Sequence, residues 1–233
     1  MLDIVLVAFV SYLIGCVNPA ALFAHRKGFD IHEAGSANAG SANAYITMGT
    51  KVAAVVLVFD LFKAFFAVKL ACWLLPGSPL AFPIATLFVV LGHVFPFQMG
   101  FHGGKGTAAF GGAVMGYSPL LFLIVIAIYF LVAFASNYLI IGTIACAAAV
   151  PFVYLYLSRN LAGAIVLCFV AAIVIGKHLG NVRRIREGKE FKFRGLWNRS
   201  EEISRLQETM TEDEYELAMN EQDNRPRLRR NQD

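Results

Sequence analysis

The stretch LLFLIVIAIYFLVAFA (residues 120–135) decides the fold, because it is wholly apolar and carries no charge. It lies within a longer region, residues 81–157, in which Lys105 is the one formally charged residue. A helix that crosses the hydrocarbon of a bilayer needs about 20 mostly apolar residues, so this region has room for several. The whole chain is 58% hydrophobic and 15% charged, whereas soluble domains average about 45–50% and about 25%. The sequence therefore predicts an all-α, polytopic membrane protein.

Seven apolar segments follow one another along the 233 residues. The fourth begins after Gly106 and stops near the break Gly116-Tyr-Ser-Pro119. Its roughly 11 residues reach only about 17 Å at 1.5 Å per residue, too short for about 30 Å of hydrocarbon. We expect this helix to be sheltered by protein or to begin from a loop that dips into the membrane. Besides this short fourth segment, the predicted segments are about residues 2–24, 52–75, 80–97, 120–135, 138–157 and 161–176.

Basic residues in the loops indicate the orientation, because cytoplasmic loops carry an excess of lysine and arginine. Arg26 and Lys27 follow the first segment, and Lys51 precedes the second. Four more basic residues lie at residues 177–186, after the seventh segment. About seven crossings then place the N-terminus outside the cell. The loops after the first, third and seventh segments share the cytoplasmic side.

The composition divides the chain into two parts. Residues 1–195 form the predicted membrane-embedded domain, and residues 196–233 form a charged cytoplasmic tail. In the tail, Ser200 before Glu201 and Glu202 is typical of the start of an amphipathic helix, but a solvated or disordered tail is favoured. The first segment lacks a basic start and a small-residue cleavage site, so we expect a retained span rather than a signal peptide.

The cysteines indicate neither a metal site nor a disulfide framework. They lie scattered in apolar runs, without CxxC or Cys/His spacing. We expect all four to be small buried hydrophobic residues: Cys16, Cys72, Cys146 and Cys168.

The first loop contains a short repeat, in which Gly35-Ser-Ala-Asn-Ala is followed by Gly40-Ser-Ala-Asn-Ala. Glycine lets backbone amides approach a ligand, and short side chains offer hydrogen bonds, so the strip suits phosphate or glycerol oxygens. The alternatives are a flexible linker and close helix packing by small residues. The candidate ligand-binding residues are Gly35, Ser36, Asn38, Ser41 and Asn43.

The second loop, residues 92–107, places one lysine among glycines. Gly103 and Gly104 precede Lys105, and Gly106 follows it, which predicts backbone amides exposed beside an ammonium group. The helix after Gly106 points its positive end at the same place, so we expect an anion there. The loop is not a nucleotide-binding P-loop, because Gly106 stands where Ser or Thr is required. The alternative is a lysine that extends to the membrane interface.

The third element ends the seventh segment. His178 and Asn181 are three residues apart and therefore share a helix face. Arg183 and Arg184 beside them anchor the orientation of the chain. In the second segment Asp60 and Lys63 also lie one turn apart, which predicts an ion pair within the membrane.

These loops together resemble the bacterial glycerol-3-phosphate acyltransferases that use acyl phosphate as donor, over roughly residues 11–194. That family's motif GSGNxGATN resembles residues 35–43, and GHxFPxxxxFxGGKG matches residues 92–106 at every fixed position. The motif HxxNIxR resembles residues 178–184, and DxxKG resembles residues 60–64. The family fold is a seven-helix membrane protein with its active site at the cytoplasmic face.

The resemblance implies a bacterial plasma-membrane enzyme that moves a fatty acyl group from acyl phosphate to sn-glycerol 3-phosphate. Lysophosphatidic acid and phosphate are the products. No cofactor, metal or nucleic acid is implied, since acyl phosphate is already activated, and the acyl chain lies between helices, entered from membrane lipid.

The resemblance also suggests roles for single residues. Lys105 and the amides around it hold phosphate. Ser36 and Asn38 position glycerol phosphate. His178 with Asn181 holds a phosphate or accepts the proton of the attacking hydroxyl, for which the donor phosphate is the alternative. His93 is a further candidate for binding substrate phosphate, and a structural hydrogen-bonding role beneath the loop is favoured for it.

Several positions depart from the family pattern. Arginines that the family usually carries are Ile46 and Asn137 here, and Ala37 and Ile140 replace a glycine and a serine. Arg26 or Lys51 is a candidate replacement cation. Two rival functions follow. One is a paralogue that is non-catalytic or transfers the acyl group to a different acceptor, and the other is a transporter of a phosphorylated solute. A transporter predicts repeated broken helices and polar groups at mid-membrane, whereas the polar residues here gather in the loops.

Overall fold

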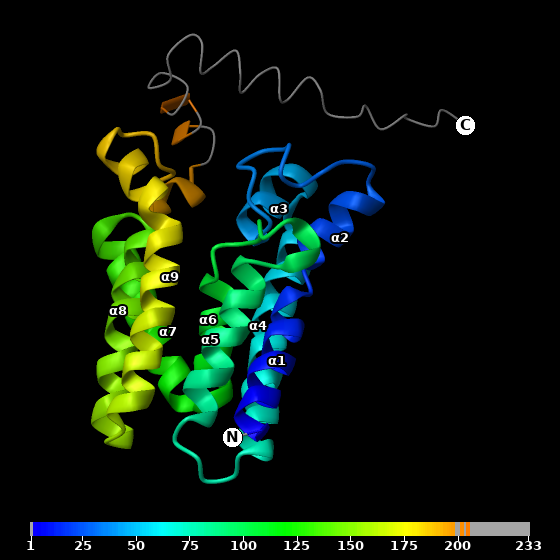
Figure 1. Cartoon of the computed structure of the whole chain (residues 1–233). Coiled ribbons are helices and arrows are strands. Elements are labelled where there is room, and N and C mark those ends of the chain that lie inside the picture. Colours follow the sequence, from blue (N-terminus) through cyan, green and yellow to red (C-terminus); the bar gives the residue numbers. More distant parts are fainter. Residues whose placement is uncertain (1, 199–200, 203, 206–233) are drawn as a thin grey trace.

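The computed structural model describes residues 2–198, 201–202 and 204–205, and all the secondary structure in that part of the chain is helical (Figure 1). The all-α prediction is therefore confirmed. The helices are α1 (Leu2–Cys16), α2 (Pro19–Arg26), α3 (Ser41–Met48), α4 (Thr50–Leu74), α5 (Ala81–Val94), α6 (Thr107–Tyr117), α7 (Pro119–Ser136), α8 (Leu139–Ser158) and α9 (Leu161–Arg186). Two short 3₁₀ helices are η1 (Phe97–Met99) and η2 (Phe193–Leu196).

The first predicted segment is broken, which residues 2–24 alone did not indicate. Asn18 has extended backbone angles, and its side-chain oxygen accepts the N–H of Ala21 at 2.9 Å to cap α2. Pro19 causes the break, because proline has no N–H and disfavours a helical conformation in the residue before it. The chain therefore bends at Val17 and Asn18 before α2 begins.

Five helical segments of the described residues are long and apolar enough to cross a membrane: Leu2–Arg26, Ala81–Met99, Pro119–Ser136, Leu139–Ser158 and Leu161–Arg186. The helix α4 has 25 residues but carries Asp60 and three lysines, and α6 has only 11. The short fourth helix is confirmed, while seven crossings and an outside N-terminus stay predictions. Only 11% of α7 is buried, so its apolar surface needs a lipid environment.

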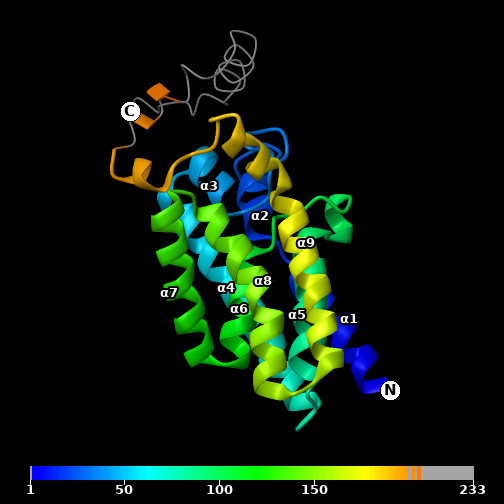
Figure 2. The same ribbon diagram turned by 90° about the vertical axis from the view of Figure 1, so that its left-hand side faces the viewer.

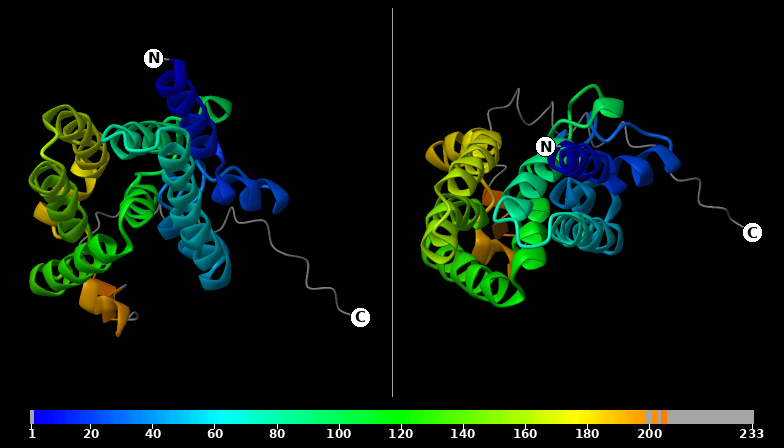
Figure 3. Two further views of the ribbon diagram at one scale, coloured as in Figure 1. Left: turned by 90° about the horizontal axis from the view of Figure 1, so that it is seen from below. Right: turned by 60° about the horizontal axis from the view of Figure 1, so that its bottom comes forward.

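The helices form two groups. In one group α1 packs on α5 and α4 on α6, and in the other α8 lies between α7 and α9 (Figure 3). Contacts of α5 with α9 and of α6 with α7 join the groups. Small residues make the tightest crossings: a methyl group on Gly15 or Gly92 would overlap the backbone of the facing helix. Close approach through small residues is a usual means of packing membrane helices.

The three polar elements of the sequence lie at one end of the bundle. The loop before α3, the loop between α5 and α6, and the last turns of α9 are all at the upper end in Figures 1 and 2, whereas the N-terminus is at the lower end. This arrangement was expected from the order of the segments. It brings glycines and basic residues from distant parts of the chain into one region.

Candidate active site

Lys105 and Asn181 meet at the centre of this region. The ammonium group of Lys105, in the loop before α6, donates a hydrogen bond of 2.6 Å to the side-chain oxygen of Asn181 on α9. The two residues are 76 positions apart, so the contact joins the two helix groups. Burial first, and the nearby Arg184 guanidinium second, lower the pKa of Lys105 from 10.5, and Glu190 opposes them.

Glu190 fixes the orientation of Asn181, and the sequence analysis did not identify it. Its buried carboxylate accepts one hydrogen bond from Asn181 Nδ2 at 2.9 Å and another from Arg184 Nε at 2.8 Å. Because the amide nitrogen of Asn181 is held by an acceptor, its oxygen turns toward Lys105. The sequence does give one indication of its role, because Glu190 is an acidic residue within a strongly basic segment, residues 177–194.

His178 lies one turn before Asn181 and faces the start of α6. Its Nδ1 is 2.8 Å from the carbonyl oxygen of Val174, and its Nε2 is 3.4 Å from the hydroxyl of Thr107. A carbonyl only accepts, so in the neutral ring Nδ1 carries the proton and Nε2 presents a lone pair. Nε2 is thus available as a base. Thr107 was also missed, although it directly follows the lysine-glycine motif.

The N-terminus of α6 is open at the same place. Gly106 precedes the helix with φ +88° and provides no side-chain cap. The first hydrogen bond of this helix joins the N–H of Phe110 to the carbonyl oxygen of Gly106 at 2.8 Å. The amides of the first turn have no partner within their own helix, and they combine with the helix dipole to favour an anion. The site therefore offers positive charge from both Lys105 and α6.

Gly103 and Gly104 serve a different purpose from the expected one. Their N–H groups donate to the carbonyl oxygens of Val94 (3.0 Å) and His93 (3.1 Å). They are therefore used within the loop, and the prediction that these two amides are exposed is wrong. A side chain on Gly104 would overlap the imidazole of His93 and approach the carbonyl of Ala39 to 3.1 Å. Glycine is needed there because the loop lies directly on its neighbours.

The first loop is organised by Asn43. This buried side chain accepts the N–H of Ser36 at 2.8 Å and donates to the carbonyls of Ile31 (3.1 Å) and Ala34 (2.9 Å). Its amide is occupied by the fold, and we therefore assign it a role in shaping the loop. The second copy of the repeat also differs from the first, because Ser41 begins helix α3.

The remaining residues of the first loop lie beside the second loop. Ser36 is exposed, whereas Asn38 and Ser41 are partly buried. Between them, the carbonyl of Ala39 faces Gly104, so the two loops touch. Within the described residues, the side chains of Ser36, Asn38 and Ser41 make no hydrogen bond to Lys105, His178 or Asn181. Gly35 has φ +61° and provides the turn that leads into this strip.

A buried ionic cluster lies below both loops. The predicted ion pair is confirmed, with 2.7 Å between Lys63 Nζ and Asp60 Oδ1. His93 joins it, since its Nδ1 lies 3.1 Å from Lys63 and 3.4 Å from Asp60. His93 is thus buried beneath the loop, which fits a structural role, and it is not placed to contact a substrate phosphate as was also predicted.

The positions that depart from the family pattern have distinct surroundings. Ile46 lies on α3 with 49% of its surface exposed. Asn137 follows α7 and binds the segment after α9: its side-chain oxygen accepts the N–H of Arg194 at 2.8 Å, and its carbonyl accepts that of Phe193 at 2.7 Å. Asn137 therefore positions the segment that begins beyond Glu190. Ile140 is half-buried in the first turn of α8.

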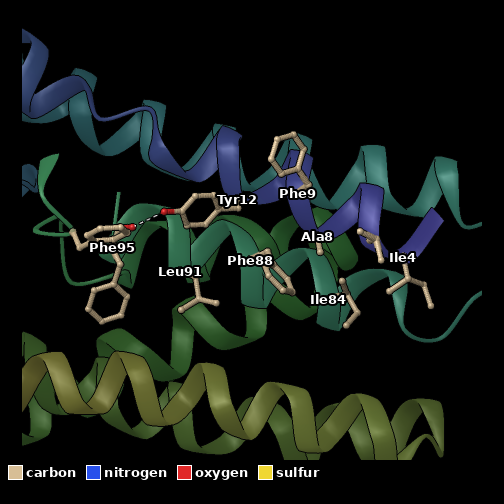
Figure 4. Close-up of a pocket in the computed structure, with 10 residues that line it drawn as sticks. Ile4, Ala8, Phe9, Tyr12, Ile84, Phe88, Leu91 and Phe95 are labelled. Carbon is tan, nitrogen blue, oxygen red and sulfur yellow. Dashed lines mark hydrogen bonds between the residues drawn. The ribbon is translucent and has the colours of Figure 1, made fainter. Parts of the chain in front are cut away.

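An apolar groove of about 610 Å³ runs between α1 and α5. Figure 4 shows its side chains along both helices, with Tyr12 donating to the carbonyl of Phe95 at 2.9 Å near the loop end. The ring of Phe95 also lies 5.0 Å from Lys177 Nζ on α9. The groove is lined by Ile4, Val5, Ala8, Phe9, Tyr12, Ile84, Phe88, Leu91, Phe95 and Phe101.

The cysteines only partly follow their prediction. Cys16 and Cys146 are buried, but Cys72 and Cys168 are exposed on helix surfaces, so the expectation of four buried thiols is wrong for these two. The described residues contain no group of three histidine, cysteine, aspartate or glutamate side chains placed to hold a metal ion. The charged tail, for which an amphipathic helix near Ser200 was the less favoured prediction, lies mostly outside the described residues.

Comparison with known proteins places these observations in a family. The family model described as Glycerol-3-phosphate acyltransferase matches residues 5–188. The chain is 34% identical over 194 residues to the glycerol-3-phosphate acyltransferase of Geobacter sulfurreducens, covering 83% of this chain and 100% of that protein. It is 34% identical over 193 residues to that of Clostridioides difficile, covering 81% and 94%.

A solved structure agrees with these matches. It is the crystal structure of PlsY (YgiH), an integral membrane glycerol 3-phosphate acyltransferase, in the glycerol 3-phosphate form. The TM-score is 0.72 at 28% identity, covering 83% of this chain and 96% of that one. The lysophosphatidic acid form gives 0.71 at 26% identity, covering 81% and 94%. The residues matched by the family model, 5–188, contain all three polar elements.

Proposed function

The chain belongs to the glycerol-3-phosphate acyltransferase family, and we propose that it takes its acyl group from acyl phosphate and transfers it to the 1-hydroxyl of sn-glycerol 3-phosphate. It is an integral membrane enzyme that acylates glycerol 3-phosphate to lysophosphatidic acid. The observation that supports the donor best is the anion site formed by Lys105 and the N-terminus of α6, with the lone pair of His178 beside it.

Phosphate chemistry explains the use of Lys105. When the acyl–oxygen bond of acyl phosphate breaks, negative charge develops on the departing phosphate. An ammonium group and open helix amides that are already in place stabilise that charge without reorganising. Asn181 holds Lys105 at 2.6 Å, and Glu190 holds Asn181, so the group is fixed before the substrate arrives.

His178 is placed to accept the proton of the acceptor hydroxyl. Nδ1 is committed to Val174, which leaves the lone pair of Nε2 near Thr107 at the start of α6. The glycerol oxygen attacks the acyl carbon, an ester bond forms, and the acyl–phosphate bond breaks. His178 takes the hydroxyl proton and returns it to the released phosphate. This direct transfer needs no acyl-enzyme.

Glycerol 3-phosphate is proposed to bind over the first loop. Exposed Ser36, with Asn38, Ser41 and the turn at Gly35, presents short polar groups next to Gly104. Asn43 supports the loop from beneath. Arg26 and Lys51 are exposed at the same end and are the candidate cations for the acceptor phosphate, since Ile46 provides none.

The groove between α1 and α5 is the proposed place of the acyl chain. Its lining is almost wholly apolar and includes residues of both helices. It reaches Phe95, whose ring contacts Lys177, the neighbour of His178 in sequence. Basic residues at this end of the bundle support a site on the cytoplasmic face of a bacterial plasma membrane.

The test uses the purified protein in lipid with palmitoyl phosphate and glycerol 3-phosphate, and measures phosphate and lysophosphatidic acid. Lys105→Ala should lower kcat/KM by about 100-fold or more, as for removal of a group that stabilises a developing anion. Lys69→Ala is the matched control, because Lys69 is an exposed lysine of α4 over Phe65. Product from palmitoyl-CoA but not from palmitoyl phosphate would contradict the proposed donor. Phosphate release without lysophosphatidic acid would indicate another acceptor.

A further inference from the structure

The cluster of Asp60, Lys63 and His93 is too deeply buried to contact a substrate. The side chains of Asp60 and Lys63 are 2% and 4% exposed, and that of His93 is 3% exposed. Burying charges is costly unless each is paired and hydrogen-bonded. Such a cluster directly beneath two substrate loops therefore calls for a role besides stability.

Lys63 connects three separate parts of the chain. Its ammonium donates to the carbonyl of Val17 at 2.6 Å and lies 3.1 Å from His93 Nδ1. Asp60 Oδ1 lies 2.7 Å away and neutralises the charge. Among the described residues, no donor reaches that oxygen in hydrogen-bond geometry, so the carboxylate acts here by charge.

The ammonium of Lys63 also determines which ring nitrogen of His93 carries the proton. A lysine ammonium only donates, so His93 Nδ1 accepts and the proton of the neutral ring is on Nε2. Nε2 is the ring atom nearest to Gly104. The orientation of this imidazole, and thus the floor beneath Gly104, depends on Lys63.

Each partner of Lys63 holds one substrate loop. Val17 precedes Asn18, whose Nδ2 donates to Ala39 of the first loop at 2.9 Å. The backbone carbonyl of His93 accepts the N–H of Gly104 in the second loop at 3.1 Å. The path from the first loop to the second therefore passes through the ammonium of Lys63, and both loops also touch where Ala39 faces Gly104.

We propose that Lys63, held by Asp60 and His93, is a positioning residue that fixes the separation of the first loop from the Lys105 loop and so aligns acceptor with donor. This role rests on the proposed function of the two loops. It differs from simple stabilisation, because a neutral cluster of the same size would preserve the fold but not the two bonds to Val17 and His93.

The discriminating variant is Asp60→Asn combined with Lys63→Met. Lys63→Met alone leaves a buried carboxylate without its counter-ion and should lower the yield of folded protein. The double variant has no buried charge, so its yield and Tm should return toward wild type. Its kcat/KM for glycerol 3-phosphate should stay about 100-fold low, since a displacement of about 1 Å is enough for such a loss. The control is Arg183→Met with Glu187→Gln, a pair at 2.8 Å on the surface of α9, which should keep wild-type activity.

A distance measurement makes the test independent of activity. Spin labels at Ala42→Cys and Phe101→Cys, both exposed sites, report the separation of the loops in a chain whose four cysteines are replaced. A broader or shifted distance distribution in the double variant supports the proposal. An unchanged distribution, or full activity in the folded double variant, would overturn it. If the wild type fails to acylate glycerol 3-phosphate, the proposed function fails while the distance measurement still decides this inference.

Discussion

Replacing Glu190 by glutamine tests how the site holds Lys105. The carboxylate accepts from two donors, Asn181 Nδ2 at 2.9 Å and Arg184 Nε at 2.8 Å. Glutamine has the same shape but only one accepting oxygen, and its NH₂ group donates. One of the two donors must therefore face another donor. If the amide of Asn181 turns to avoid this, it presents NH₂ instead of oxygen to the ammonium of Lys105.

The magnitude follows from the bond that is lost. A hydrogen bond to a charged group contributes about 1.5–3 kcal/mol. Arg184 is 45% exposed, so solvent screening reduces the upper part of that range. We expect a cost of about 1–2 kcal/mol, which corresponds to a fall of about 5–30-fold in the population with Lys105 correctly held.

The assay is steady-state kinetics with palmitoyl phosphate and glycerol 3-phosphate. Glu190→Gln should lower kcat/KM by that factor, with the protein still folded as judged by its Tm. Glu187→Gln is the matched control, because Glu187 lies three residues earlier and pairs with the exposed Arg183. Activity of Glu190→Gln within twofold of wild type would refute the argument that the orientation of Asn181 matters.

Three other predictions follow from the same geometry. Gly104→Ala should lower activity at least about tenfold and also lower the Tm, because the added methyl group overlaps the His93 ring. Kinetics and thermal unfolding measure the two effects. Gly180→Ala is the control, because a methyl group on Gly180 would meet no neighbouring atom. The affinity of the protein for inorganic phosphate should fall as the pH rises, because phosphate binding needs the charged ammonium form of Lys105. Burial lowers the pKa of Lys105, so the fall should begin below pH 10.5, the pKa of an ordinary lysine. An affinity that titration calorimetry finds independent of pH would show that Lys105 is not involved. Ala8→Phe, which fills the groove, should raise KM for palmitoyl phosphate more than for a short-chain acyl phosphate, and equal changes would exclude the groove as the acyl site.

Much of the fold could be predicted, because helices that cross a membrane are long apolar stretches that are visible in the sequence. A long apolar run has few alternatives in lipid, where every backbone polar group must be bonded internally. The break at Val17 and Asn18 was the main omission. Pro19 was visible, yet an apolar run with a proline near its end is also compatible with a continuous helix, since proline is accepted in first turns. Its neighbour Asn18 decides the matter by capping α2.

The site was only partly predictable, for a reason of geometry. Lys105 among glycines, and His178 with Asn181, are local patterns that a sequence displays. Which amides remain open is not local: Gly103 and Gly104 use theirs on carbonyls of α5. Glu190 was missed for the same reason, because only the turn after α9 brings it back to Asn181.

The short length of α6 links the fold to the chemistry. The helix α4 has 25 residues and α6 has 11, which correspond to about 38 Å and about 17 Å. If α6 were long enough to span the membrane, its positive N-terminus would lie at the aqueous surface. A helix of three turns that starts from a loop can hold it lower, beside buried His178. A fatty acyl donor arrives from the bilayer and a phosphorylated acceptor from water, so a site for both substrates requires positive charge at the depth where the acyl chain begins. The glycines of the second loop allow the chain to reach that depth, because they pack backbone directly on α5 and on Ala39.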